Sequence, residues 1–296
     1  MGAPVSNVIE TLLKDGPVIT DGAWGTELDN RGLGPGEMPD LWNLSHPDQV
    51  ESVAQAYVNA GSKVVLTNTF RASRLALGKL LEGKPEEFVR DINVAGVKIS
   101  KRAAGDKALV FASIGPSGKL LLTKQVTEEQ LADSFEEQAN ALAEGGADAL
   151  VVETMIDLVE AKIAIGAAKR TGLPVVGSVV FDSGKNKDRT MMGVTPEQAV
   201  AELEDCGADI IGANCGIGIE NYIPICERYA QTTDLPIWIK ANAGMPELVG
   251  VEVRYNTTPQ EFASHLKTLI AAGASFIGGC CGTSPLFITE LVNELR

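Results

Sequence analysis

Three cysteines in this chain stand where they can act as ligands of one metal ion. Cys280 and Cys281 are adjacent within "IGGCCGTSP" (277–285), and Cys215 ends the segment "ADIIGANC" (208–215). Thiolates are soft ligands that suit zinc, and three protein ligands leave the fourth tetrahedral position open, as is typical of a catalytic zinc. The pattern predicts a zinc site held by Cys215, Cys280 and Cys281.

The adjacent pair has two other interpretations, a strained disulfide and simple core packing. Neighbouring side chains on a regular strand point to opposite faces, so adjacent cysteines share an ion only where glycines, here Gly278, Gly279 and Gly282, relax the backbone. An odd total of five cysteines without an export signal favours reduced thiols and a cytoplasmic location. Cys206 and Cys226 are interpreted as small hydrophobic packing residues.

Eight short, apolar, β-branched segments must position these residues. Most are continuously apolar, as is typical of parallel strands covered on both faces. They are 16–22, 63–69, 108–116, 147–154, 173–181, 208–215, 236–244 and 274–281. Eight strand–helix units in 296 residues predict a single-domain α/β fold, a (β/α)8 TIM barrel over residues 1–296. A doubly wound sheet is the alternative, but "DGAWGTELDNRG" lacks the glycine fingerprint expected after its first strand.

The segments between the strands mostly have helical periodicity. Three of them open on a threonine that is expected to begin a helix, namely Thr127, Thr195 and Thr258. Four strands follow near copies of one phrase, "NAGSK", "GGADA", "CGADI" and "AGASF". In each phrase a glycine can take the left-handed conformation that ends a helix before the chain turns into a strand.

Active sites of TIM barrels lie at the carboxyl ends of the strands. Nearly every predicted strand ends there in a polar or metal-binding residue. The set is Asp21, Thr67, Asn68, Thr69, Ser113, Glu153, Thr154, Ser178, Asn214, Cys215, Lys240, Asn242, Cys280 and Cys281. Buried carboxylates are costly without a cation, so Asp21 and Glu153 are candidates to bind an ammonium group. Alternatively, Asp21 caps the following turn and Glu153 pairs with Lys240 or an arginine.

The motifs "DGAWGTEL", "LTNTF", "VVETMID", "GANC", "ANAGMP" and "IGGCCGTSP" occur in this order along essentially the whole chain. Together they resemble the motifs of the homocysteine S-methyltransferase family. The resemblance implies a (β/α)8 barrel with zinc on Cys215, Cys280 and Cys281. It also implies that the thiol of homocysteine takes the fourth position on the metal and is methylated to give methionine.

The resemblance implies further contacts to the amino-acid end of the substrate. Asp21 and Glu153 would hold the amino group, and the backbone N–H groups around Gly22 and Ala23 would hold the carboxylate. Asn214 and Asn242 are predicted to orient loops or ligands, or to occupy the open position on zinc. Capping of a tight turn is an equal alternative for both asparagines.

The methyl donor is less defined. The motifs resemble the homocysteine domain of cobalamin-dependent methionine synthase, which predicts methylcobalamin carried on a separate, corrinoid-carrying protein. A small donor of the S-methylmethionine or betaine type is the alternative. Arg71 follows "TNTF" at a position where betaine-type members have a tyrosine that binds zinc, so a betaine donor is disfavoured.

Composition and charge disfavour several other functional classes. The net charge of −14 and the pI near 4.7 argue against a nucleic-acid partner, and the sequence has no apolar run long enough for a membrane span. Two alternatives stay open: a zinc–thiolate barrel that binds a ligand without turnover, and an aldolase that forms a Schiff base at Lys240. His46 and His265 lie away from strand ends and are interpreted as structural.

Overall fold

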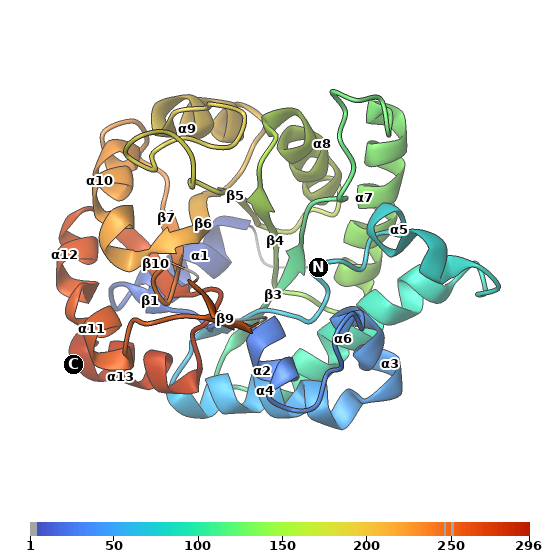
Figure 1. The fold of residues 1–296 in the computed structure, drawn as a ribbon, viewed down its shortest axis with the longest axis horizontal. Coiled ribbons are helices and arrows are strands. Elements are labelled where there is room, and N and C mark those ends of the chain that lie inside the picture. The colour runs from blue at the N-terminus through green and yellow to red at the C-terminus, as the bar shows by residue number, and fades with distance from the viewer. Residues whose placement is uncertain (1–4, 246, 250–251) are drawn as a thin grey trace.

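Eight parallel strands form a nearly closed barrel in the computed structural model, which describes residues 5–245, 247–249 and 252–296 (Figure 1). The strand order is β1–β10–β7–β6–β5–β4–β3–β2. The bounds are β1 Val18–Ile19, β2 Val64–Val65, β3 Leu109–Ile114, β4 Ala149–Met155, β5 Val175–Val179, β6 Ile210–Gly218, β7 Ile237–Asn242 and β10 Ala274–Gly279. Between β1 and β2, the N–H of Lys63 donates to the carbonyl of Ile19 at 2.8 Å. The predicted TIM barrel is confirmed.

Helices surround the barrel (Figure 1). They are α1 Val5–Leu13, α2 Gly25–Asp29, α3 Trp42–Ser45, α4 Pro47–Ala60, α5 Arg74–Leu77, α6 Phe88–Ala104, α7 Glu128–Glu144, α8 Leu158–Lys169, α9 Pro196–Asp205, α10 Ile219–Ala230, α11 Pro259–Ser264, α12 Leu266–Ala271 and α13 Pro285–Leu295, with short 3-10 helices at Pro39–Leu41 and Gly78–Leu81. Capping boxes at Thr127, Thr195 and Thr258 confirm the three predicted helix starts. The segment after Thr258 differs in one respect, because it is divided at His265 into α11 and α12.

The four repeated phrases have the predicted backbone. Their glycines at 61, 146, 207 and 273 have φ values of 105°, 94°, 89° and 112°. This left-handed conformation strains side-chain-bearing residues but not glycine. In each phrase this glycine therefore ends a helix before the chain enters the next strand.

The interior of the barrel is filled by apolar side chains from all eight strands. The ring of Trp238 stacks on Phe111 with centroids 6.0 Å apart and lies 5.6 Å from the ring of Phe276. Helix α1 packs into the same cluster through Ile9 and covers the amino-terminal end of the barrel. Each large apolar side chain buried here contributes about 1.5–3 kcal/mol. The packed interior leaves the carboxyl ends of the strands as the place for a ligand.

Between β7 and α11 the chain forms an antiparallel hairpin that the sequence analysis did not predict. Its strands are β8 Glu247–Val249 and β9 Glu252–Arg254. Tyr255 follows the hairpin, and its ring lies so close to Gly282 that a Cβ at that glycine would come within 2.3 Å of it. The hairpin thus brings an aromatic side chain beside the adjacent cysteines.

None of the described helices is both long and apolar enough to cross a bilayer. The two remaining cysteines sit in helical packing positions, with Cys226 buried in α10 and Cys206 half-buried at the end of α9. Burial raises the pKa of the Cys226 thiol to about 12 and that of Cys206 to about 11. Both therefore stay protonated near neutral pH, in keeping with a packing role.

Candidate active site

The sulfur atoms of Cys215, Cys280 and Cys281 meet at the carboxyl end of the barrel, all within 4.8 Å of one another. The Sγ atoms of Cys215 and Cys281 are 3.8 Å apart. Two thiolates on one tetrahedral zinc, each at about 2.3 Å from the metal, lie about 3.8 Å apart. In the described part of the chain, no other group of three His, Cys, Asp or Glu residues has its ligand atoms this close.

All five cysteines are free thiols, which contradicts the disulfide interpretation of the adjacent pair. The sulfurs instead interact as thiols. Hydrogen bonds from the thiols of Cys280 and Cys281 lower the pKa of Cys215 below its ordinary value, while the interaction with Cys215 raises the pKa of Cys281. A cluster that favours a thiolate at one of its members is a suitable site for a soft divalent cation.

Irregular backbone turns the three sulfurs toward one point. Cys215 has φ +63°, within an irregular stretch of β6 between Asn214 and Gly218, and the hydroxyl of Tyr222 donates to its carbonyl at 2.7 Å. A left-handed non-glycine residue costs about 1 kcal/mol or more and persists only where its surroundings hold it. Strain of this kind at a strand end is common in functional sites.

The glycines beside the pair act differently from the prediction. Only Gly282 has positive φ, at +79°. Gly278 and Gly279 are needed for space, because a Cβ on the first would lie 2.0 Å from Thr20 Oγ1 and on the second 2.2 Å from Thr283 Oγ1. The pair is therefore positioned by close packing of β10 against β1 as well as by turn geometry.

Asn214 connects three strands beneath the cluster. Its Oδ1 accepts from the backbone N–H of Thr154 at 2.9 Å and from the hydroxyl of Ser178 at 2.7 Å. Its Nδ2 donates to Thr154 Oγ1 at 2.7 Å and to Glu153 Oε2 at 3.3 Å, and lies 4.0 Å from Cys280 Sγ. The side chain is fully buried and fixes the ends of β4, β5 and β6 relative to one another.

Glu153 and Asp40 are the two carboxylates in the wall of the cavity above the cluster. Burial raises the pKa of Glu153 to about 7, although the hydroxyl of Ser113, which donates to Oε1 at 2.5 Å, and the charge of Lys240 lower it. A buried carboxylate poised near neutral pH gains a great deal from a cationic ligand, because that ligand stabilises its charged form.

Asp21 has a different environment. Its Oδ1 forms a buried ion pair with Lys240, whose ammonium also donates to the Asp21 carbonyl at 2.8 Å. Its Oδ2 accepts from the indole N–H of Trp24 at 2.8 Å and from the backbone N–H of Leu66 at 2.7 Å. The sequence alternative that paired Lys240 with Glu153 is wrong, because Asp21 takes the ammonium.

The remaining predicted residues lie around the same point. Gly22 lines the cavity, and a Cβ there would come within 2.8 Å of Tyr57 and Thr283. The N–H of Ala23 donates to Thr283 Oγ1 at 3.1 Å. Asn242 lies close enough to Cys215 to lower its pKa, and its buried Oδ1 has no hydrogen-bond partner. A buried amide oxygen without a partner next to a thiol cluster can accept a hydrogen bond from a ligand or coordinate a metal ion.

A cavity of about 330 Å³ opens above the cluster. Its lining includes Gly22, Ala23, Asp40, Arg71, Ser113, Glu153, Thr154, Cys215, Lys240, Cys280 and Cys281. Asp40 in this lining was missed from the sequence, as were Tyr255 and Thr283 beside the cluster. Asp40 lies in the short 3-10 helix Pro39–Leu41 and Tyr255 directly follows β9, so neither ends one of the predicted barrel strands. Thr283 had a signal, since it directly follows the "CCG" turn.

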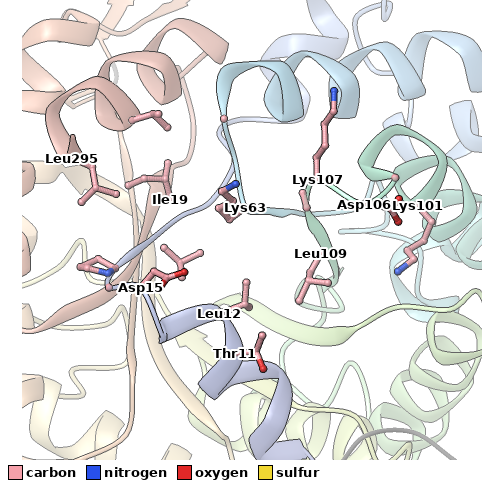
Figure 2. A pocket seen from close by; sticks show the side chains of 17 residues that line it. Thr11, Leu12, Asp15, Ile19, Lys63, Lys101, Asp106, Lys107, Leu109 and Leu295 are labelled. Carbon is pink, nitrogen blue, oxygen red and sulfur yellow. The ribbon is translucent and has the colours of Figure 1, made fainter.

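A larger cavity of about 690 Å³ lies at the opposite end of the barrel, between α1, α13 and the starts of the first strands (Figure 2). Lys63, Lys101 and Lys107 line it, but their ammonium groups do not converge in Figure 2. The ammonium of Lys101 is bound to the carboxylate of Asp148 at 2.9 Å and 3.0 Å. None of its 17 lining residues is a cysteine or histidine, so it has no counterpart of the thiol cluster at the carboxyl end.

The site and fold together define a class of TIM barrel with a three-thiol cluster at its catalytic face. The sequence matches the family model described as homocysteine S-methyltransferase over residues 18–295. The chain therefore belongs to the homocysteine S-methyltransferase family. The family predicted from the sequence motifs is thus confirmed, and with it the prediction that the chain belongs to a family of methyltransferases.

Individual relatives agree with this assignment. The chain is 30% identical over 305 residues to a methionine synthase of Mycobacterium leprae and 31% identical over 301 residues to one of Mycobacterium tuberculosis. These matches cover 97% and 95% of this chain but only 25% of each relative. The metallated homocysteine methyltransferase MmuM of Escherichia coli has the same fold, with a TM-score of 0.78 and 23% identity over 96% of this chain and 98% of that one.

Proposed function

We propose that this protein transfers a methyl group to the thiol of homocysteine, giving methionine, at a zinc ion held by Cys215, Cys280 and Cys281. The observation that carries the proposal is the convergence of three sulfurs beneath a cavity that also contains Glu153. The donor set, the sulfur spacing and the unpartnered Oδ1 of Asn242 all fit zinc. Zinc bound there would keep the substrate sulfur as a thiolate at neutral pH.

The residues of the chain then position the substrate. We assign the ammonium group of homocysteine to Glu153, which lines the cavity and gains stabilisation from a cation. Asp21 supports this contact indirectly. Its carboxylate oxygens are bonded to Lys240, Trp24 and the backbone N–H of Leu66, and these bonds fix the wall of the cavity. With both ends of the substrate fixed, its sulfur lone pair attacks the methyl carbon in line and the donor's leaving group departs with the bonding electrons.

The two asparagines have distinct proposed roles. Asn214 holds Glu153 and the cluster in register through its hydrogen bonds to three strands. Asn242, whose side chain hydrogen-bonds to Cys215 and whose buried Oδ1 has no partner, is the proposed fourth ligand of zinc in the absence of substrate. A neutral amide oxygen would be a weaker ligand for zinc than a thiolate, so Asn242 would leave this position available to the substrate thiol.

We propose methylcobalamin on a separate corrinoid-carrying protein as the donor. The support is the resemblance to the homocysteine domain of cobalamin-dependent methionine synthase and the identity with two methionine synthases. In this proposal residues 1–296 act as one catalytic domain in the cytoplasm. The aldolase alternative is disfavoured, because the ammonium of Lys240 is buried in its ion pair with Asp21.

The proposal is tested by turnover of zinc-loaded protein with homocysteine and a panel of donors: free methylcobalamin, S-methylmethionine and betaine. Methionine is quantified by mass spectrometry. We expect methionine from methylcobalamin and none from betaine. Production from S-methylmethionine alone would replace the proposed donor but keep the acceptor. Failure of every donor, while zinc and homocysteine still bind, would favour the zinc–thiolate binding protein.

A further inference from the structure

Thr154, in the wall of the catalytic cavity, has a backbone conformation that a β-branched residue rarely adopts. Its φ is +61°, in the left-handed region, where a branched side chain is strained. Among the described residues, three other non-glycine residues have positive φ. Lys124 and Lys187 lie in exposed loops, and the third is the proposed zinc ligand Cys215. Such strain persists only where the surrounding structure holds it, and inside a cavity it indicates a role in the site.

The strained residue belongs to a β-bulge at the end of β4. At this point two residues of β4, Glu153 and Thr154, stand opposite one residue of β5, Ser178. Neighbouring side chains on a regular strand point to opposite faces. Because the bulge adds one residue, Glu153 and Thr154 both line the cavity, and Met155 returns to the apolar layer between the barrel and its helices. The bulge therefore places a hydroxyl next to the carboxylate.

The backbone N–H and the hydroxyl of Thr154 are both bound by the side chain of Asn214. The N–H donates to Asn214 Oδ1 at 2.9 Å, and Thr154 Oγ1 accepts from Asn214 Nδ2 at 2.7 Å. The asparagine is fully buried in β6, and its Oδ1 also accepts from the hydroxyl of Ser178 at 2.7 Å. The left-handed backbone of Thr154 is thus held by a partner that is itself fixed.

The same amide group also reaches Glu153. The distance from Asn214 Nδ2 to Glu153 Oε2 is 3.3 Å, whereas that to the hydroxyl of Thr154 is 2.7 Å. Strong N–H···O bonds are about 2.9 Å long, so the threonine receives the stronger of the two bonds. Because Oε1 of Glu153 accepts from the hydroxyl of Ser113, Oε2 is the oxygen that is left for a cationic ligand. Without the hydroxyl of Thr154, Oε2 would be the remaining oxygen acceptor of the amide.

We propose that Thr154 is a positioning residue for recognition of the substrate ammonium. Its hydroxyl engages Asn214 Nδ2, and Oε2 of Glu153 therefore stays available to a cation. The inference rests on the proposed function for the identity of the acceptor and for the role of Glu153, and it adds a residue to which that function gives no role. It follows that Thr154 affects the binding of thiols that carry an amino group and not of thiols that lack one.

The test compares homocysteine with 4-sulfanylbutanoate, which has the same thiol and carboxylate groups but no amino group. Binding of each to zinc-loaded protein is measured by calorimetry without a methyl donor. In Thr154→Ala we expect the Kd for homocysteine to rise about 10-fold, as for a weakened hydrogen bond to a charged group. The Kd for 4-sulfanylbutanoate should change less than about twofold. Thr154→Ser keeps the hydroxyl and should bind both thiols as the wild type does.

A pair of glycine variants separates the hydroxyl from the strained backbone. Thr154→Gly relieves the strain that alanine keeps, yet it should weaken homocysteine as much as Thr154→Ala does, because both lack the hydroxyl. Lys124→Gly is the matched control, since it relieves the same left-handed strain at an exposed residue outside the cavity. It should leave both dissociation constants unchanged. Zinc content and melting temperature establish that each variant is loaded and folded.

Three results would overturn the inference. The first is unchanged binding of homocysteine in Thr154→Ala, and the second is equal weakening of both thiols in that variant. The third is equal affinity of the wild type for the two thiols, because Glu153 would then not bind the ammonium. Since no methyl donor is present, the expected pattern of Kd values in a protein without turnover would support the inference and contradict the proposed methyl transfer alone.

Discussion

The ammonium of Lys240 and the carboxylate of Asp21 form an ion pair that is almost completely shielded from water. Lys240 lies in β7 and Asp21 follows β1, with β10 between these two strands in the sheet. The pair therefore ties together strands on both sides of the one that carries Cys280 and Cys281. Since Lys240 also donates to the Asp21 carbonyl, it fixes the backbone that leads into the cavity wall at Gly22 and Ala23.

Removal of one partner of this pair should be strongly destabilising. Lys240→Met leaves the carboxylate of Asp21 buried without its cation, so we expect a loss of about 3–5 kcal/mol in the free energy of unfolding. The double variant Asp21→Asn with Lys240→Met removes both charges and should recover part of this loss. Urea denaturation of both variants and the wild type measures the difference. A single variant as stable as the wild type would show that the pair contributes nothing.

Metal retention should depend on the cluster and not on cysteine in general. Cys215→Ser replaces one soft thiolate, and we expect zinc content to fall well below one ion per chain together with loss of methyl transfer. Cys206→Ser is the control, because among the described residues its side chain hydrogen-bonds only to helix carbonyls at the end of α9. Zinc is measured by plasma mass spectrometry after dialysis. Equal zinc in both variants would remove Cys215 from the ligand set.

The raised pKa of Glu153 predicts that the free energy of unfolding depends on pH. A folded pKa of about 7 against the usual 4.5 means that the unfolded chain releases the proton at lower pH than the folded one. The free energy of unfolding should therefore fall as the pH rises from 4.5 to 7. The contribution of Glu153 to this fall is at most about 3 kcal/mol, and it does not change further above pH 7. Glu153→Gln should lack this component, so its stability relative to the wild type should rise across the window.

The measurement is urea denaturation of both proteins at several pH values in the absence of zinc and substrate. Asp40, whose pKa burial raises to about 6, contributes a fall of the same sign in both proteins and cancels in the comparison. A difference between the two proteins that does not change with pH would contradict the raised pKa of Glu153.

Substitution of Gly278 by alanine tests whether the close approach of β10 to β1 is required. The substitution puts a Cβ 2.0 Å from Thr20 Oγ1 and 2.6 Å from the carbonyl of Asp21, so the strands must separate. We expect a destabilisation of about 1–3 kcal/mol and weaker zinc binding, because Cys280 moves with the strand. Gly166→Ala, in α8 with no atom within 4 Å of the new Cβ, should instead be neutral or stabilising by about 1 kcal/mol. Thermal melts and zinc content separate the two outcomes.

Much of this molecule was determined by local sequence. Continuous apolar runs fixed the eight strands, threonines with a glutamine or glutamate three residues later fixed three helix starts, and a repeated glycine fixed four helix ends. Each of these depends on interactions within a few residues, which a sequence displays directly. The barrel follows because few arrangements satisfy eight such units, and the barrel in turn places the strand ends, with Cys215, Cys280 and Cys281, on one face.

The tertiary structure alone decided which polar groups are partners. Asp21 and Glu153 look equivalent as acids at strand ends, yet one is bound by Lys240 and the other faces the cavity. Gly278 looks like a flexible turn residue, yet it is required by the proximity of Thr20. Pairing and close packing join residues more than two hundred positions apart, and their energies depend on distances and burial that only the folded chain defines.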